Sequence, residues 1–137
     1  NAILSYYAQI AEKAGTALEI QAQMEKEIPV PEPEFCVLLG NLLENAVDAC
    51  RENNESGTIK VHIRQTGTSL IAITVDNPCR NPPVLEGKRF LSTKHSGPGI
   101  GTQSIRLIAE RHHGDARFEW KNGMFYASVI LIPSAES

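Results

Sequence analysis

Two stretches of the sequence decide the fold: NLLENAVDA at residues 41–49 and SGPGIGT at residues 96–102. In the first stretch, Asn41, Asn45 and Asp48 recur at helical spacing among apolar residues, so they share one face of a helix. Asparagine is a poor helix former, because its amide competes for backbone hydrogen bonds. The stripe is therefore either a solvated polar surface or a ligand site. The side-chain oxygen of Asn45 would suit Mg²⁺, which keeps several waters and takes few protein ligands.

The second stretch is rich in glycine and leads directly into a predicted helix. Gly97, Gly99 and Gly101 permit positive φ and let backbone N–H groups approach a ligand closely. The start of the helix adds unpaired donors and the positive end of the helix dipole, which together suit a phosphate group. An ordinary flexible loop explains the same glycines. The stretch is not a P-loop, because no Gly-Lys-Ser/Thr follows, and Lys94 is the nearby cation that we expect to meet phosphates.

Outward from these stretches, the hydrophobic pattern predicts an α+β fold. Helices are expected over residues 3–14, 34–53 and 102–113, and strands over 17–24, 58–65, 69–76, 115–120 and 125–132. Three prolines before residue 34 should exclude regular structure there, and residues 77–101 are expected to form a long functional loop. Hairpins with helices between them predict a two-layer sandwich, in which helices cover one face of a mixed, mostly antiparallel sheet. His112 and His113 are expected to be capping or surface residues.

Composition excludes several classes of protein. The 137 residues suit a single domain, over residues 1–137, and a net charge of −3 gives no electrostatic footprint for nucleic acid. The three cysteines have neither disulfide nor zinc spacing, so we expect reduced thiols. Because the chain begins at Asn1 inside a predicted helix, we expect a fragment of a longer protein.

Taken together, these motifs resemble the GHKL ATPase superfamily, whose nucleotide-binding architecture is the Bergerat fold. Residues 41–49 match its N box, Asp76 and Asn77 the start of its G1 box, FLSTK at 90–94 its F box, and GPGIG at 97–101 its G2 box. The sequence is most similar to catalytic ATP-binding domains of bacterial sensor histidine kinases of the peptide-quorum-sensing type. The resemblance covers nearly the whole chain and implies a long ATP lid at about residues 78–101.

The resemblance implies ATP and Mg²⁺ as cofactors. It places Asn45 on Mg²⁺, Asn41 beside the phosphates, and Asp76 on the adenine amino group, with the loop glycines around the phosphates. The other motif residues implied to bind nucleotide are Asp48, Asn77, Phe90, Ser92, Thr93, Lys94, Ile100 and Thr102. Two prolines depart from the family pattern: Pro78 replaces the G1 glycine, and Pro98 removes an N–H from the G2 box, which puts nucleotide affinity in doubt.

The resemblance also implies the reaction. Water-using relatives carry a glutamate at the position of Asn41, and an amide cannot take a proton from water, so transfer to a histidine is favoured over hydrolysis. Asn41, Glu44 and Lys94 are the expected catalytic residues, although Glu44 could equally be an exposed helix residue.

The implied function is transfer of the γ-phosphoryl group of ATP to a histidine on an upstream dimerisation domain of the same protein. The isolated domain would be monomeric and inactive alone, and the parent a homodimeric two-component sensor that signals to a response regulator. We expect a cytoplasmic domain, with a bacterial membrane protein as one candidate parent. The alternatives are a nucleotide-binding or interaction module without catalysis, and a serine kinase of the anti-sigma-factor type.

Overall fold

The computed structural model describes residues 2–25, 27–52, 57–80, 84–86, 89–91 and 100–133. Its elements, in chain order, are α1 (Ala2–Lys13), β1 (Ala17–Gln23), α2 (Glu32–Glu52), β2 (Thr58–Thr66), β3 (Leu70–Pro78), β4 (Val84–Glu86), β5 (Arg89–Leu91), α3 (Ile100–Arg111), β6 (Asp115–Lys121) and β7 (Met124–Leu131). Among the described residues, no helix is both long enough and apolar enough to span a bilayer.

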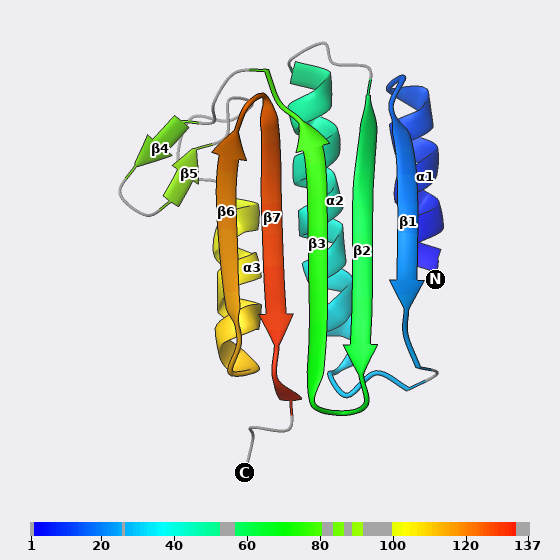
Figure 1. Ribbon diagram of the computed structural model, residues 1–137, viewed down its shortest axis with the longest axis vertical. Helices are drawn as coiled ribbons and strands as arrows, with labels where there is room; N and C mark the ends of the chain where they lie inside the picture. Colours follow the sequence, from blue (N-terminus) through cyan, green and yellow to red (C-terminus); the bar gives the residue numbers. More distant parts are fainter. Residues whose placement is uncertain are drawn as a thin grey trace.

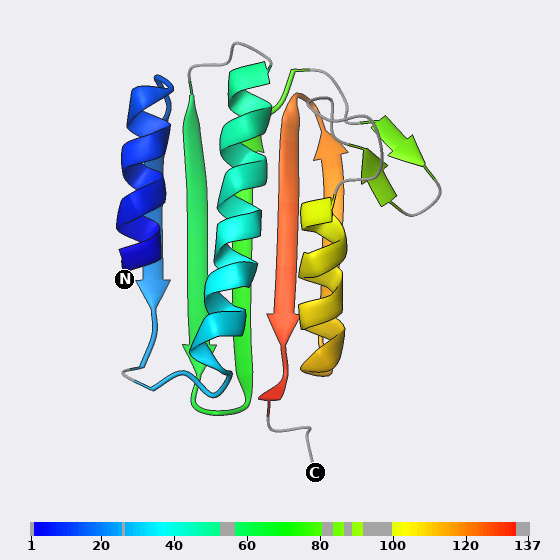
Figure 2. The same ribbon diagram turned by 180° about the vertical axis from the view of Figure 1, so that it is seen from behind.

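The strands of the main sheet follow the order β1-β2-β3-β7-β6. β1 pairs with β2 in parallel, across the crossover that α2 provides, and the other neighbours are antiparallel. All three helices lie on one face of this sheet, with α2 between α1 and α3 (Figures 1 and 2). The α+β sandwich predicted from the sequence is therefore confirmed.

The core lies between the sheet and the helices. In β2 and β3 every second residue is buried, which places one row of branched side chains against the helix layer. α2 supplies the other side of the core with a broad apolar face. The largest buried side chains of this contact are Phe35, Leu38, Leu39, Leu42, Leu43, Ile59, Val61, Ile63, Ile71 and Ile73.

Most element boundaries differ from the prediction by one or two residues. α2 begins at Glu32, so Pro33 lies inside its first turn, where a missing N–H leaves no helical bond unmade. The predicted loop over residues 77–101 was wrong in part, because β3 runs on through Pro78 and the short strands β4 and β5 form a hairpin. Three-residue strands are too short to give a recognisable hydrophobic period.

Positive φ values mark several turns among the described residues. Asn122 and Gly123 have φ of 50° and 78° between β6 and β7, as a tight hairpin turn requires. α3 ends in a Schellman arrangement, in which His113 has φ of 60° and the N–H of Gly114 bonds to the Ala109 carbonyl at 2.8 Å. The capping role expected for His113 is therefore confirmed.

Candidate functional site

Polar groups converge where three elements end. The C-terminal ends of α2 and β3 and the N-terminal end of α3 lie toward the same end of the molecule (Figure 2). The Cys50 thiol on α2 lies 3.7 Å from the Pro78 carbonyl oxygen at the end of β3, which ties the helix layer to the sheet at this point. The hairpin of β4 and β5 projects beside β6 at the same end (Figure 1).

Asn41 and Asn45 lie on the side of α2 that faces α3. Seven residues before Asn41, which is about two helical turns, Glu34 contacts α3 through Arg111 and His112. Asn41 and, one turn further, Asn45 therefore continue this stripe toward the end of α2 where α3 begins. Both are partly buried, and neither side chain has a hydrogen-bond partner within the described part of the chain. Two such amides in mid-helix fit a ligand site better than a structural role.

Glu44 lies toward α1, the opposite neighbour of α2, whereas Asp48, seven residues after Asn41, stays on the stripe of the two asparagines. Burial raises the pKa of the Tyr7 hydroxyl on α1, and nearby Glu44, Tyr6 and Asp48 raise it further. Glu44 is exposed and lies one residue, or about 100° around the helix, from Asn45. The structure thus places Glu44 toward α1, away from the stripe of Asn41 and Asn45.

Strand alternation separates the two residues of the G1 box. In β3 the buried residues Ile73, Val75 and Asn77 face the helices, and Asn77 is only 2% exposed. Asp76 lies on the helix-free face of the sheet, opposite Lys60 of β2 and Tyr126 of β7. The structure therefore does not bring Asp76 to the face that carries Asn41 and Asn45, whereas it does bring Asn77 there. The alternation of side chains along this strand, which is visible in the sequence, already indicated that Asn77 and not Asp76 faces the helices.

The surroundings of Asp76 agree with this placement. Partial burial raises the pKa of its carboxyl above the usual value, and the charges of His62 and Lys60 offset only part of that rise. Both basic residues project from β2 on the helix-free face, where the burial pattern leaves them exposed. The carboxyl thus belongs to a polar cluster on the outer face of the sheet.

The side-chain amide of Asn77 has a fixed orientation. Its Nδ2 donates to the Pro78 carbonyl oxygen at 2.9 Å, and a carbonyl can only accept, so the Oδ1 atom is left as an acceptor. Two hydrogen bonds fix the backbone of Cys79, two residues after Asn77. The Cys79 N–H donates to the Gly123 carbonyl at 2.8 Å, and Trp120 Nε1 donates to the Cys79 carbonyl at 2.7 Å. The strand end that carries Asn77 is therefore firmly positioned.

The first turn of α3 is suited to an anion. Ile100 and Gly101 open the helix, Thr102 is buried, and no acidic residue lies in the first turn. Phe90 lies in β5. The remaining predicted loop residues, Ser92, Thr93, Lys94, Gly97 and Gly99, lie outside the described residues.

The far end of α3 is anchored to the start of α2 by a buried histidine. The side chain of His112 is 8% exposed, and its Nε2 lies 3.2 Å from Glu34 Oε1, which also accepts from Arg111 Nη1 at 2.9 Å. Of the capping or surface positions expected for His112, the surface position was wrong, because Glu34 contacts its ring and the N–H of Ile132, just after β7, donates to the His112 carbonyl at 2.9 Å. Sequence spacing alone does not reveal this packing.

Replacing Glu34 with glutamine is expected to lower the free energy of unfolding by about 0.5–1 kcal/mol at neutral pH, a modest value because the carboxylate is partly exposed. Partial burial raises the pKa of Glu34, but the hydrogen bonds and charges of Arg111 and His112 outweigh it and leave the pKa below its usual value. A carboxylate whose pKa is lower in the folded than in the unfolded state stabilises the folded protein at pH values above its unfolded pKa, about 4.3. This stabilisation is lost as the pH falls through the pKa of the folded state. Urea unfolding of the unmodified chain and the Glu34→Gln variant at pH 7 and pH 3 measures the loss of stability and its dependence on pH. A difference between the two proteins that stays constant down to pH 3 would contradict the assignment.

Comparison with known families supports the interpretation of the motifs. The family model described as the GHKL domain matches residues 32–133. The chain belongs to the GHKL domain family. The predicted resemblance to histidine kinase catalytic ATP-binding domains is confirmed at the level of the family, while the peptide-quorum-sensing type stays a prediction.

Similar proteins carry names of sensor kinases. The chain is 29% identical over 109 residues to a probable C4-dicarboxylate sensor kinase of Bacillus subtilis, covering 76% of the chain and 20% of that protein. It is 26% identical over 142 residues to the sensor histidine kinase ZraS of Salmonella typhimurium, covering 97% of the chain and 30% of that protein. The chain thus spans less than a third of the length of these curated relatives.

Solved structures share the fold. The catalytic domain of the histidine kinase ThkA superposes with a TM-score of 0.74 at 21% identity, covering 96% of this chain and 88% of that one. The Acinetobacter baumannii histidine kinase AdeS gives a TM-score of 0.69 at 12% identity, covering 96% of this chain and 61% of that one. At such identities the likeness establishes the architecture alone.

Proposed function

We propose that this domain binds ATP with Mg²⁺ between α2, the end of β3 and the start of α3, and transfers the γ-phosphoryl group to a histidine on another domain of a longer protein. The observation that carries the proposal is that Asn41 and Asn45 lie on the side of α2 toward α3, while Asn77 faces the helix layer from the end of β3, near the N-terminus of α3. The sensor-kinase names of the relatives support the reaction class.

Asn77 would recognise the adenine base through a hydrogen bond. Its Oδ1 atom accepts no hydrogen bond from the described residues, so it would favour the exocyclic amine of adenine and disfavour the carbonyl that guanine carries at the same place. Asp76, the residue expected from the motif to do this, faces the other side of the sheet. In this domain the buried amide therefore takes the role that the resemblance gave to the carboxylate.

The phosphates would lie against the first turn of α3, whose unpaired N–H groups and dipole favour negative charge. Asn45 would hold Mg²⁺ through its side-chain oxygen, and the ion when bound neutralises phosphate charge. Asn41 would lie beside the phosphates, where its amide can donate a hydrogen bond but cannot activate water. Lys94 would add a cation, and Glu44 stays a weaker candidate because of its place beside α1. The other residues proposed to contact nucleotide are Asp48, Phe90, Ser92, Thr93, Gly97, Gly99, Ile100, Gly101 and Thr102.

The rest of the proposal concerns the longer protein. The phosphoryl acceptor would be a histidine on an upstream dimerisation domain, and a response regulator would receive the group from it. The parent would be a homodimeric sensor, with this domain on the cytoplasmic side of a bacterial membrane. The name of one relative as a sensor histidine kinase supports this arrangement.

Calorimetric titration of the chain with ATP and Mg²⁺ tests the binding step. Asn77 and Asp76 are adjacent but lie on opposite faces of β3, so alanine variants of the two make a matched pair. Asn77→Ala is expected to weaken ATP binding about tenfold, because it removes one buried hydrogen bond, whereas Asp76→Ala should leave ATP binding unchanged. The ratio of ATP to GTP affinity should fall only in the Asn77 variant, a readout that general loss of stability does not mimic.

Two outcomes would overturn parts of the proposal. No heat with any adenine nucleotide for the unmodified chain would overturn nucleotide binding itself. A loss of ATP preference in the Asp76 variant, with the Asn77 variant unaffected, would leave nucleotide binding in place and overturn the assignment of the base contact. Thermal unfolding of each variant shows whether the buried Asn77 site still folds.

A further inference from the structure

The outer edge of β1 is an open pairing surface. β1 pairs only with β2 within the described part of the chain. The Ala17 N–H donates to the Gly57 carbonyl before β2, so odd-numbered residues of β1 direct their backbone groups to β2. The N–H and C=O groups of Leu18, Ile20 and Ala22 consequently point outward from the edge of the sheet.

The two edges of the sheet are protected differently. β6, at the opposite edge, carries four charges in alternation, Asp115, Arg117, Glu119 and Lys121, which discourage pairing with another strand. β1 is a regular seven-residue strand with Glu19 as its one charge and no proline. Edge strands of this kind bind extended peptides in proteins that recognise partners by strand addition.

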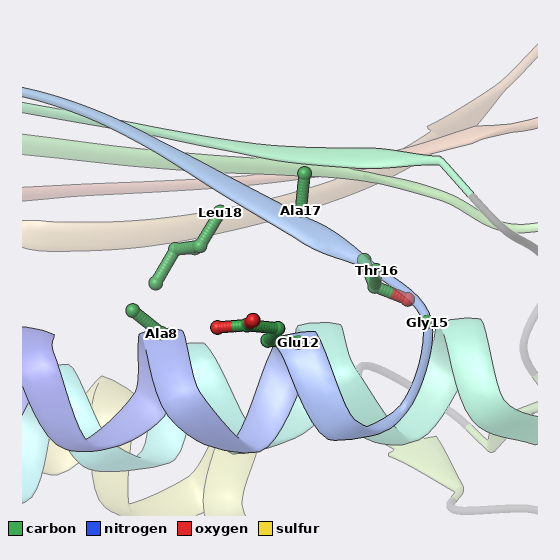
Figure 3. A pocket seen from close by; sticks show the side chains of 6 residues that line it. All are labelled: Ala8, Glu12, Gly15, Thr16, Ala17 and Leu18. Atoms are coloured by element: carbon green, nitrogen blue, oxygen red, sulfur yellow. The ribbon is translucent and has the colours of Figure 1, made fainter.

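A groove lies beside this edge. It has a volume of about 420 Å³ and is lined by Ala8, Glu12, Gly15, Thr16, Ala17 and Leu18, between α1 and β1. Figure 3 shows the Glu12 carboxylate in the gap between the helix and the strand, with the small side chain of Ala8 and the apolar Leu18 further along. Among the described residues Glu12 has no hydrogen-bond or ion-pair partner, and the buried hydroxyl of Thr16 also lacks one.

We propose that β1 and this groove bind an extended, basic segment of a partner protein as a sixth strand of the sheet. The backbone of the segment would pair with Leu18, Ile20 and Ala22. Its small apolar side chains would lie under α1 beside Ala8 and Leu18, and a lysine or arginine would reach Glu12, whose negative charge has no counterpart among the described residues.

The position of α1 excludes a second copy of this chain as the occupant. α1 lies over β1 and projects past it on the outer side (Figures 1 and 2). Paired strands lie about 4.8 Å apart, whereas packed helices need about 8–10 Å between their axes. Two copies joined through β1 would therefore bring their α1 helices into collision, while a single strand without a helix fits beneath the overhang.

The test uses the whole chain and a synthetic peptide, acetyl-KTVTKTV-amide, whose lysines and valines share one face of a strand, and binding is followed by backbone amide shifts in NMR spectra. The peptide is expected to shift the amides of β1 and α1 and to leave those of β6 unmoved. A charge-swapped peptide, acetyl-ETVTETV-amide, should bind at least tenfold more weakly to the unmodified chain, and Glu12→Lys should reverse the order of the two peptides.

Two variants of β1 separate pairing from folding. Ala22→Pro removes an N–H that points outward, so the β1–β2 hydrogen bonds and the melting temperature should persist while peptide binding falls at least tenfold. Ala22→Ser keeps the N–H and should bind as before. The proposal is overturned if Ala22→Pro binds normally, if the basic peptide shifts only amides away from β1, or if sedimentation shows the chain dimerising through β1.

Discussion

Replacing Asn45 with alanine is expected to remove the dependence of ATP binding on Mg²⁺ and to lower phosphoryl transfer by the longer protein about 100-fold. The side-chain oxygen of Asn45 is the protein ligand that we propose for the ion, and it lies partly buried on the stripe of α2 that faces α3. Loss of a group that holds or orients a metal ordinarily costs about 10- to 100-fold in affinity or activity. Calorimetry with and without Mg²⁺ measures the first effect, and radiolabel transfer from ATP the second.

Asn45→Asp is the matched control, because it keeps an oxygen at the same place. It should retain binding that depends on Mg²⁺, whereas alanine should not. The phosphorylated product should also be acid-labile, as phosphohistidine is, and an acid-stable product would favour a serine kinase of the same fold. Transfer that survives unchanged in the alanine variant would remove Asn45 from the site.

Replacing Gly114 with alanine is expected to destabilise the chain by about 4 kcal/mol, a large part of a domain's usual stability of about 5–15 kcal/mol. A Cβ atom on Gly114 would lie 1.6 Å from the carbonyl oxygen of Ile130 and 3.1 Å from the Cα atom of Leu131. Both obstacles are backbone of β7, so a side-chain rotation cannot relieve the clash. Urea unfolding monitored by circular dichroism gives the free energy.

Gly123→Ala serves as the control for this prediction. Gly123 has φ of 78°, and a Cβ atom at this position would point into open space, so only the cost of the left-handed backbone applies, about 1 kcal/mol. If the two variants lose equal stability, backbone conformation rather than the close approach to β7 explains the need for glycine at position 114.

Much of the fold could be predicted from the sequence, because most elements are long enough to show their period. The apolar positions of α2 recur along 21 residues, and the hairpin signal of Asn122 and Gly123 is local and strong. The hydrophobic pattern could not reveal β4 and β5, whose three residues each give no period. Nor could it reveal the burial of His112, which depends on contacts with Glu34 of α2 and with Ile132 just after β7.

The candidate site was predicted by motif rather than by geometry, and the two differ at one position. The motif directed attention to Asp76, while the alternation from Ile71 through Val75 assigns the helix-facing place to Asn77. The negative charge of Asp76 favoured it as a ligand residue in the sequence. The direction of a side chain in a strand, however, depends only on its position along the strand. Glu44 is a second charged residue whose position decides its direction. It lies one residue, or about 100° around the helix, from Asn45, which places it toward Tyr7 and away from the asparagine stripe.

The hydrogen bond from Trp120 to the Cys79 carbonyl has a practical consequence. Trp120 is the single tryptophan of the chain, and its indole is held at 2.7 Å from a backbone oxygen two residues beyond Asn77. Indole emission depends on the polarity and hydrogen bonding around the ring. The domain therefore carries its own fluorescent reporter, and occupancy of the neighbouring strand end can be followed in real time without a label.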